Sequence, residues 1–258
     1  MFDLLELVMP PGLPGWVVLV LVLASALTAF VTTSLGIGGG VLLMAIMTLF
    51  MPAAVVIPVH GVIQLGSNAG RMALAWQRIR WPVLAAFTVG SVLGVALGAQ
   101  VLVELRPGWM ELILGVFIVW ACLGPMPRVS QGSRYKVGLG GAVTSALTLF
   151  VGATGPMVAA LIRAMGLDRR DHVSTFAACM VVQHGLKIVV FGAVGFAFGP
   201  YAGLMVAMIL FGVLGTWIGG LVLERMHDRL FHRLLTVVLL LLAGRLIYVG
   251  LRDLSAAA

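Results

Sequence analysis

Long apolar runs alternate along the chain with short connections that carry most of its charges. Most of the runs approach 20 residues, the approximate length at which an α-helix crosses the hydrocarbon core of a bilayer. They lack the residue-by-residue alternation of a membrane β-barrel strand. We therefore expect an all-α polytopic membrane protein with helical segments at 16–34, 38–50, 52–74, 82–103, 109–124, 138–152, 154–165, 172–195, 200–222 and 234–250.

Three of these segments are too short for a comfortable crossing. Segment 38–50 follows the glycine run Gly36–Gly40, and segment 154–165 follows Gly152–Pro156. Segments 38–50, 138–152 and 154–165 are therefore interpreted as half-helices that meet at glycine-rich breaks. Broken helices at membrane depth are tolerated where they are buried in protein or line a cavity.

Basic residues gather in four connections, which hold 12 of the 16 lysines and arginines. The positive-inside rule places these connections in the cytoplasm and both termini outside. Arg245 and Arg252, near the outer C-terminal end, are exceptions. The four groups are Arg71, Arg78 and Arg80; Arg128, Arg134 and Lys136; Arg163, Arg169 and Arg170; and Arg225, Arg229 and Arg233.

This orientation predicts two inverted-topology repeats, each a broken-helix hairpin followed by three transmembrane helices. The first hairpin enters the membrane from outside and the second from inside. The expected domains are an N-terminal repeat at 1–124, a cytoplasmic linker at 125–136 and a C-terminal repeat at 137–258. Inverted repeats with broken helices are a transporter design in which the site lies near the midplane.

Weak internal identity supports a duplication. Gly94 and Gly98 align with Gly215 and Gly219, and both pairs belong to glycine ladders with four-residue spacing. The same alignment pairs Gln64 with Gln183, and it pairs Gly39 with Gly155 if three residues are inserted near 165–171. We interpret the ladders as close helix packing, because small residues let membrane helices approach each other.

Composition narrows the class of function. Hydrophobic residues make up 61% of the 258 residues and charged residues 10%, and the net charge of +7 is spread over short loops. This charge distribution is not that of a nucleic-acid-binding surface, and the lipid bilayer is the expected partner. Cys122 and Cys179 both lie in predicted spans, so we expect no disulfide, metal site or cofactor. The first run follows Asp3 and Glu6 without a basic leader, so we treat it as mature protein.

The glycine-rich breaks are the first candidate for a binding site. A helix that starts inside the protein has unpaired N–H groups, and these attract anions. Glycines let a ligand approach the backbone, and nearby hydroxyls add donors. A simple turn with close helix packing is the alternative. The predicted substrate-binding residues of the breaks are Thr33, Ser34, Gly36, Gly38, Gly39, Gly40, Thr154 and Gly155.

Lys187 is the second candidate, because it lies well inside the apolar segment 172–195. An ionisable residue inside a span is costly and marks a functional site by default. Gln183 lies one turn away on the same helix face, and His184 is beside it. Snorkelling of Lys187 to the outer surface, or pairing with a carbonyl, is the alternative.

The matching helix of the first half carries a polar stripe of His60, Gln64, Ser67, Asn68 and Arg71. Of these we predict His60, Gln64 and Asn68 to contact the substrate. Hydrogen bonding between helices without transport is the alternative. All nine carboxylates lie at span ends, in loops or in the tails, so an anion is favoured over a cation. The histidines leave proton coupling open.

The chain has the Gly36–Gly40 run just after the first span, a four-span half that is repeated once, and a basic central linker. In these features it resembles the TauE/SafE family of sulfite exporters and organosulfur-anion permeases. The resemblance extends over nearly the whole chain. It implies a bacterial inner-membrane transporter of small sulfur-containing anions such as sulfite, thiosulfate, sulfoacetate or sulfolactate. The second break, Gly152–Pro156, departs from the pattern because it lacks a triple glycine.

The sequence therefore predicts a transporter of small anions and not an enzyme, with the site between the two breaks. A passive channel or facilitator on the same architecture is the first alternative. An intramembrane serine protease is disfavoured because His60 and Ser67 lie two helical turns apart. A metal permease using His60, His184 and Cys179 has poor ligand spacing. The sequence leaves open which anion is carried, in which direction, with which coupling ion, and whether the protein is a homodimer.

Overall fold

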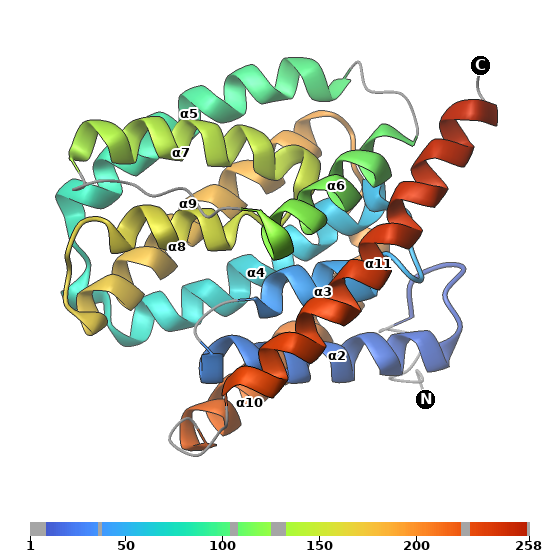
Figure 1. Cartoon of the computed structure of the whole chain (residues 1–258), viewed down its shortest axis with the longest axis horizontal. Helices are drawn as coiled ribbons and strands as arrows, with labels where there is room; N and C mark the ends of the chain where they lie inside the picture. Colours follow the sequence, from blue (N-terminus) through green and yellow to red (C-terminus); the bar gives the residue numbers. More distant parts are fainter. Residues whose placement is uncertain (1–8, 36–37, 104–107, 125–132, 223–227, 257–258) are drawn as a thin grey trace.

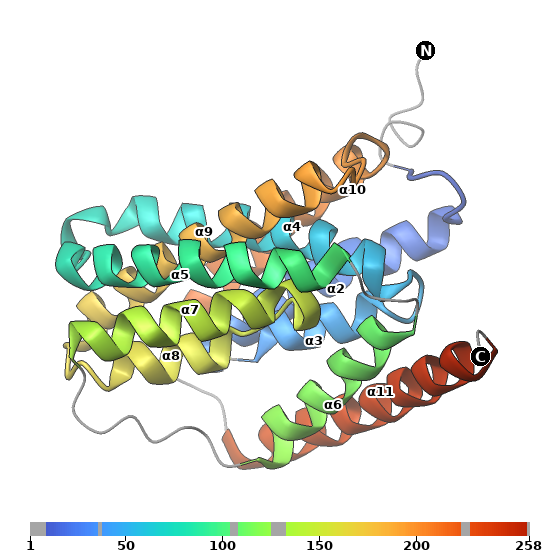
Figure 2. The same cartoon turned by 90° about the horizontal axis from the view of Figure 1, so that it is seen from above.

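The computed structural model describes residues 9–35, 38–103, 108–124, 133–222 and 228–256, and these residues form helices and connections without a strand. Figures 1 and 2 show long helices running roughly side by side. The α-helices are α2 (Gly15–Leu35), α3 (Gly39–Met47), α4 (Ala53–Leu74), α5 (Trp81–Val103), α6 (Trp109–Leu123), α7 (Arg134–Val151), α8 (Gly155–Arg163), α9 (Arg169–Ala193), α10 (Ala202–Val222) and α11 (Asp228–Ala256). Two short 3₁₀ helices, η1 (Trp76–Arg78) and η2 (Gly199–Tyr201), precede α5 and α10.

Within the described residues, four segments are long and apolar enough to cross a membrane: Gly15–Thr33, Trp81–Leu102, Arg169–Ala193 and Gly199–Gly219. The expected all-α polytopic membrane protein is confirmed. Nine of the ten predicted segments begin within four residues of an observed helix start. The last helix differs most, because its charged ends hid its full extent from a search for apolar runs.

Helices from the two halves of the chain pack against each other in a regular order. The closest pairs are α5 with α7, α2 with α10, α4 with α9, and α6 with α11. Figure 2 shows α6 and α11 together along one side of the molecule. The main apolar core lies between the helices of both halves and includes the fully buried side chains of Leu21, Met44, Ile57, Leu114 and Leu149.

Glycine ladders hold two of these pairs together. A Cβ atom on Gly94 of α5 would lie 1.9 Å from the Ala142 carbonyl oxygen of α7, and one on Gly215 of α10 would lie 1.9 Å from the Ala26 carbonyl oxygen of α2. Backbones this close leave no room for any side chain. The packing interpretation of the ladders is confirmed.

The basic connections lie at one end of the molecule. Figure 1 shows the α4–α5 turn, the start of α7 and the α8–α9 turn together, opposite the α3–α4 turn and the C-terminus. The Arg80 amide donates to the Thr175 hydroxyl oxygen at 3.0 Å, which ties the α4–α5 turn to α9. The fourth predicted group begins at Arg225, which lies outside the described residues.

Gly94→Ala should lower the free energy of unfolding by about 1–3 kcal/mol, because the methyl group forces α5 and α7 apart. Thermal unfolding of purified protein in detergent measures the effect. Gly244→Ala is the matched control, since nothing lies within 4 Å of its added Cβ and alanine favours a helix over glycine. Equal melting temperatures for the Gly94→Ala and Gly244→Ala variants would contradict the role of the glycine ladder in packing α5 against α7.

Candidate functional site

The two predicted breaks are present, and each is followed by a half-helix. α3 begins at Gly39 after Gly38, whose φ of 101° suits only glycine. α7 ends at Gly152, whose φ of 66° turns the chain toward α8. α3 and α8 have nine residues each. Nine residues extend about 14 Å, roughly half of the hydrocarbon core.

Both half-helices begin beside the same cavity, which has a volume of about 50 Å³. One buried water needs roughly 10–15 Å³ on this scale, so the cavity has room for a few waters or one small anion. Its backbone side is formed by Gly38, Gly40 and Val41 at the start of α3 and by Ala153, Gly155 and Pro156 at the start of α8.

The two helix starts differ in the backbone hydrogen bonds of their described residues. The first helical hydrogen bond of α3 runs from the Leu42 amide to the Gly38 carbonyl at 3.0 Å, so the amides of Gly39, Gly40 and Val41 precede it. In α8, Pro156 has no N–H and Met157 already donates to the Thr154 carbonyl at 3.0 Å.

Helices α4 and α9 supply the polar walls of the cavity with His60, Gln64, Asn68, Arg71 and His184. The His60 Nε2 atom lies 2.9 Å from the Gly40 carbonyl oxygen, which fixes the imidazole ring against the α3 break. The two histidine rings are 6.2 Å apart, centroid to centroid, and nearly perpendicular.

Three of these wall residues carry polar atoms without a hydrogen-bond partner in the described part of the chain. They are the Nδ1 atoms of His60 and His184 and the Oδ1 atom of Asn68, all buried. Buried polar atoms are normally satisfied, so unsatisfied ones around a cavity indicate water or a ligand.

Arg71 supplies the positive charge on the cavity wall. Its guanidinium donates to the Ser67 hydroxyl at 3.2 Å, and it borders both the main cavity and a smaller one between α2, α4 and α10. Sequence reasoning placed Arg71 in the polar stripe but did not assign it to the site, because its position near a span end also fits the basic-loop pattern. Its spacing of i+3 from Asn68 was the available signal.

Behind the cavity, Gln183 ties the second break to α7. Its Oε1 atom accepts from the Thr154 hydroxyl at 2.8 Å, and its Nε2 atom donates to the hydroxyls of Thr144 at 3.2 Å and Ser145 at 3.1 Å. All four side chains are buried. Gln183 therefore fixes the break and does not face the cavity.

Lys187 also lies behind the cavity and is fully buried. Its Nζ atom donates to the Gly152 carbonyl at 3.0 Å. This carbonyl belongs to the C-terminal end of α7, the negative end of the helix dipole, where a cation is favoured. Lys187 lies closely against α4, because a Cβ on Gly61 would be 2.7 Å from its Cε atom. The alternative of pairing with a carbonyl is the arrangement observed.

The predicted site residues thus divide into two groups. Those that line the cavity are Gly38, Gly40, His60, Gln64, Asn68, Gly155 and His184. Those that do not line it are Thr33, Gly39, Thr154, Gln183 and Lys187. The Thr33 hydroxyl donates to the Ala29 carbonyl within α2, and it is Thr32 that borders the cavity. Gly36 and the side chain of Ser34 lie outside the described residues.

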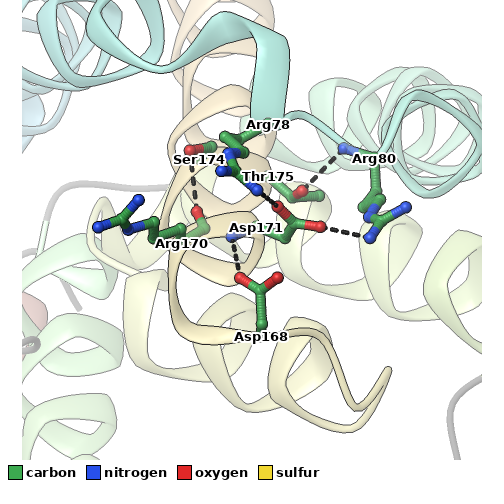
Figure 3. A network of polar contacts seen from close by, with 7 residues as sticks. All are labelled: Arg78, Arg80, Asp168, Arg170, Asp171, Ser174 and Thr175. Carbon is green, nitrogen blue, oxygen red and sulfur yellow. Dashed lines mark hydrogen bonds and ion pairs between the residues drawn. The ribbon is translucent and has the colours of Figure 1, made fainter.

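α9 carries a buried carboxylate, Asp171, in its first turn. Figure 3 shows its carboxylate between the guanidinium groups of Arg78 and Arg80, at 3.8 Å and 2.5 Å. Two arginines therefore balance this negative charge at the basic end of the molecule. No described carboxylate lines the main cavity.

Long apolar helices around two half-helices that start at one cavity with polar side chains in its wall are the architecture of a membrane transporter. Residues 21–246 match the family described as Sulfite exporter TauE/SafE, and the chain belongs to that family. It is also similar to the probable inner membrane transporter protein TsaS of Comamonas testosteroni, with 26% identity over 125 residues. That alignment covers 46% of this chain and 52% of the relative, so it spans about half the length of the relative.

Gln183→Leu should lower the free energy of unfolding by about 1–3 kcal/mol, because the buried Thr154 hydroxyl loses its acceptor. Thermal unfolding in detergent measures this loss. Gln77→Leu, an exposed glutamine at the α4–α5 turn, is the matched control and should melt like the unchanged protein. A Gln183→Leu variant as stable as the control would show that the network does not fix the break.

Proposed function

We propose that this protein carries small sulfur-containing oxyanions, of the sulfite or organosulfonate class, across the bacterial inner membrane. The observation that carries the proposal is the cavity at which two helix starts and the Arg71 guanidinium converge, with no carboxylate among its lining residues. Helix N-termini and a guanidinium both favour negative charge. Membership of the family described as Sulfite exporter TauE/SafE supports a sulfite-like substrate, and the relative supports transport across the inner membrane.

The cavity offers acceptors as well as donors, which narrows the substrate chemistry. The amides of Gly40 and Val41 and the Arg71 guanidinium are donors, whereas the Asn68 Oδ1 atom only accepts. An oxyanion that carries a proton, such as hydrogen sulfite, satisfies both kinds of group. A bare oxyanion needs a bridging water at Asn68. The volume of about 50 Å³ favours the smallest members of the class in this conformation.

We further propose that the two halves are inverted repeats. In the proposed repeat, α2, α3, α4, α5 and α6 correspond to α7, α8, α9, α10 and α11. This correspondence converts the packed pair α5–α7 into the packed pair α10–α2, and it leaves the pairs α4–α9 and α6–α11 unchanged. The sequence alignment pairs Gly94 with Gly215, and the two glycines make equivalent contacts. An added Cβ on Gly94 would lie 1.9 Å from the Ala142 carbonyl oxygen, and one on Gly215 would lie 1.9 Å from the Ala26 carbonyl oxygen. Such symmetry supports transport by rocking of one half against the other.

Charge distribution supports the proposed orientation, with the basic connections in the cytoplasm and both termini outside. Arg245 does not oppose it, because its guanidinium donates to the Thr48 carbonyl at 2.9 Å and so neutralises the C-terminal end of α3. Fully buried Met44 and Ile57 pack against Gly152 on the outer side of the cavity. A closed apolar layer there favours a carrier over an open channel.

The roles of Arg71 and the buried Lys187 differ in this proposal. Arg71 contacts the anion, and Lys187 adds positive field from behind while it holds the Gly152 carbonyl away from the anion. Gln183 and Thr154 keep the second helix start in place. Gly38, Gly40, His60, Gln64, Asn68, Gly155 and His184 form the contact surface.

Arg71→Gln should raise the substrate concentration for half-maximal sulfite transport by roughly 10- to 100-fold, the value of one hydrogen bond to a charged group. Uptake of radiolabelled sulfite into proteoliposomes measures it. Arg163→Gln, which removes an exposed arginine from the same end of the molecule, should leave transport unchanged. Equal transport by both variants would remove Arg71 from the site. Sulfite counterflow identifies a carrier, and a steady conductance identifies a channel.

Gly155→Ala should weaken transport without unfolding the protein. A Cβ on Gly155 has its nearest neighbours at 3.8 Å, on Met180, and 3.9 Å, on Phe176, both of which line the cavity. The methyl group therefore enters the cavity at ordinary contact distances and takes space from the anion. Gly185→Ala, with nothing within 4 Å of its Cβ, is the control. We expect lower sulfite uptake by Gly155→Ala than by Gly185→Ala, with unchanged melting temperatures in both. Identical uptake by the two variants would contradict the placement of the anion beside Gly155.

A further inference from the structure

A second hollow lies at the basic end of the molecule, away from the transport cavity. It has a volume of about 730 Å³ and is formed by the end of α4, η1 and the first turns of α9. Arg78, Arg169 and Arg170 line it together with Leu74, Trp76 and Val173. Its lining shares no residue with that of the transport cavity.

The charges in this hollow are not balanced. Arg169 and Arg170 occupy the first turn of α9, the positive end of the helix dipole, where a cation is disfavoured. The Asp171 carboxylate is engaged by Arg80 and Arg78, and the Asp168 carboxylate accepts from the Asp171 amide at 2.9 Å. No carboxylate in the described part of the chain pairs with Arg169 or Arg170.

Figure 3 shows the Arg170 side chain extending away from the Asp171 carboxylate. Its backbone carbonyl instead accepts from the Ser174 hydroxyl at 2.9 Å. The Arg170 side chain therefore lies outside the ion-pair network, and Arg170 borders the hollow. An anion placed there would meet Arg169, Arg170 and Arg78 and would relieve the unfavourable position of Arg169 and Arg170.

The rim of the hollow is apolar and exposed. Leu74 is 90% exposed, Trp76 57% and Val173 47%. A tryptophan at the end of a spanning helix is typical of the membrane–water interface. A free inorganic anion gains nothing from such a rim, whereas the acyl chains of a lipid cover it. Basic pockets between transmembrane helices on the cytoplasmic side are suited to anionic headgroups.

We propose that this hollow binds the phosphodiester headgroup of an anionic phospholipid. Arg169, Arg170 and Arg78 contact the phosphate, and the lipid chains lie over Leu74, Trp76 and Val173. The bound lipid then joins the α4–α5 turn to the start of α9, the same two elements that Asp171 links through Arg78 and Arg80.

The test measures lipid binding by the full chain after delipidation in neutral detergent. Phosphatidylglycerol, phosphatidylcholine and inorganic phosphate are titrated separately and followed by native mass spectrometry. Arg169→Gln/Arg170→Gln should weaken phosphatidylglycerol binding about 30-fold, the effect of two arginines near an anionic headgroup. Arg134→Gln/Arg163→Gln is charge-matched, exposed at the same end and outside the hollow, and should bind normally.

Equal weakening in both double variants would overturn the proposal, since it would reflect net charge alone. Competition by inorganic phosphate as strong as that by phosphatidylglycerol would overturn it too, because the site would then bind a free anion. A photoactivatable phosphatidylglycerol, applied to the unchanged protein, does not depend on how the variants fold. Adducts on residues 73–78 and 169–174 support the site, and adducts only elsewhere contradict it.

Discussion

The structure depends on one constraint: two helices begin in the interior of the protein. The first amides of a helix have no carbonyl partner within it, and burial away from water makes unsatisfied amides costly. α3 and α8 resolve this by starting at a shared cavity, with Gly40 and Gly155 on its surface. The chain therefore maintains a small polar volume inside an otherwise apolar bundle. The glycine ladders, the buried network and the basic residues all contribute to holding that volume in place.

The polar residues around the breaks have two distinct tasks. Gln183 and Lys187 satisfy the groups that the end of α7 and the start of α8 expose, so they fix the geometry of the second break. His60, Asn68 and Arg71 line the cavity, and two of these three have a buried polar atom with no hydrogen-bond partner among the described residues. A network that is fully satisfied stabilises the fold, whereas one left incomplete is available to a ligand. The division favours a ligand on the α3 side, where most of these residues lie.

Most of the fold could be predicted from the sequence, because apolar length, glycine breaks and basic connections report directly on how helices sit in a membrane. The half-helix character of 38–50 and 154–165 was predicted from their length and the glycine-rich breaks, and the observed α3 and α8 agree. The same prediction for 138–152 was wrong, because α7 has 18 residues and begins at Arg134 among polar residues that a search for apolar runs passes over. Which polar residue faces the cavity could not be predicted. Lys187 and Gln183 share a helix face with cavity residues on α9, but small helix rotations decide whether a side chain meets a ligand or a carbonyl. Arg71 was ambiguous for another reason, because an arginine near a span end fits both a binding site and a topology signal.

The location of the bound anion tests the account most directly. Selenite has the shape and charge of sulfite, and its selenium atom scatters X-rays anomalously, so crystals of the protein soaked in selenite reveal the anion without ambiguity. The account predicts one anomalous peak between the starts of α3 and α8, within hydrogen-bond distance of the Arg71 guanidinium and the amides that precede Leu42. A peak beside Lys187 and Gln183 with none at the cavity, or peaks only on the protein surface, would contradict it.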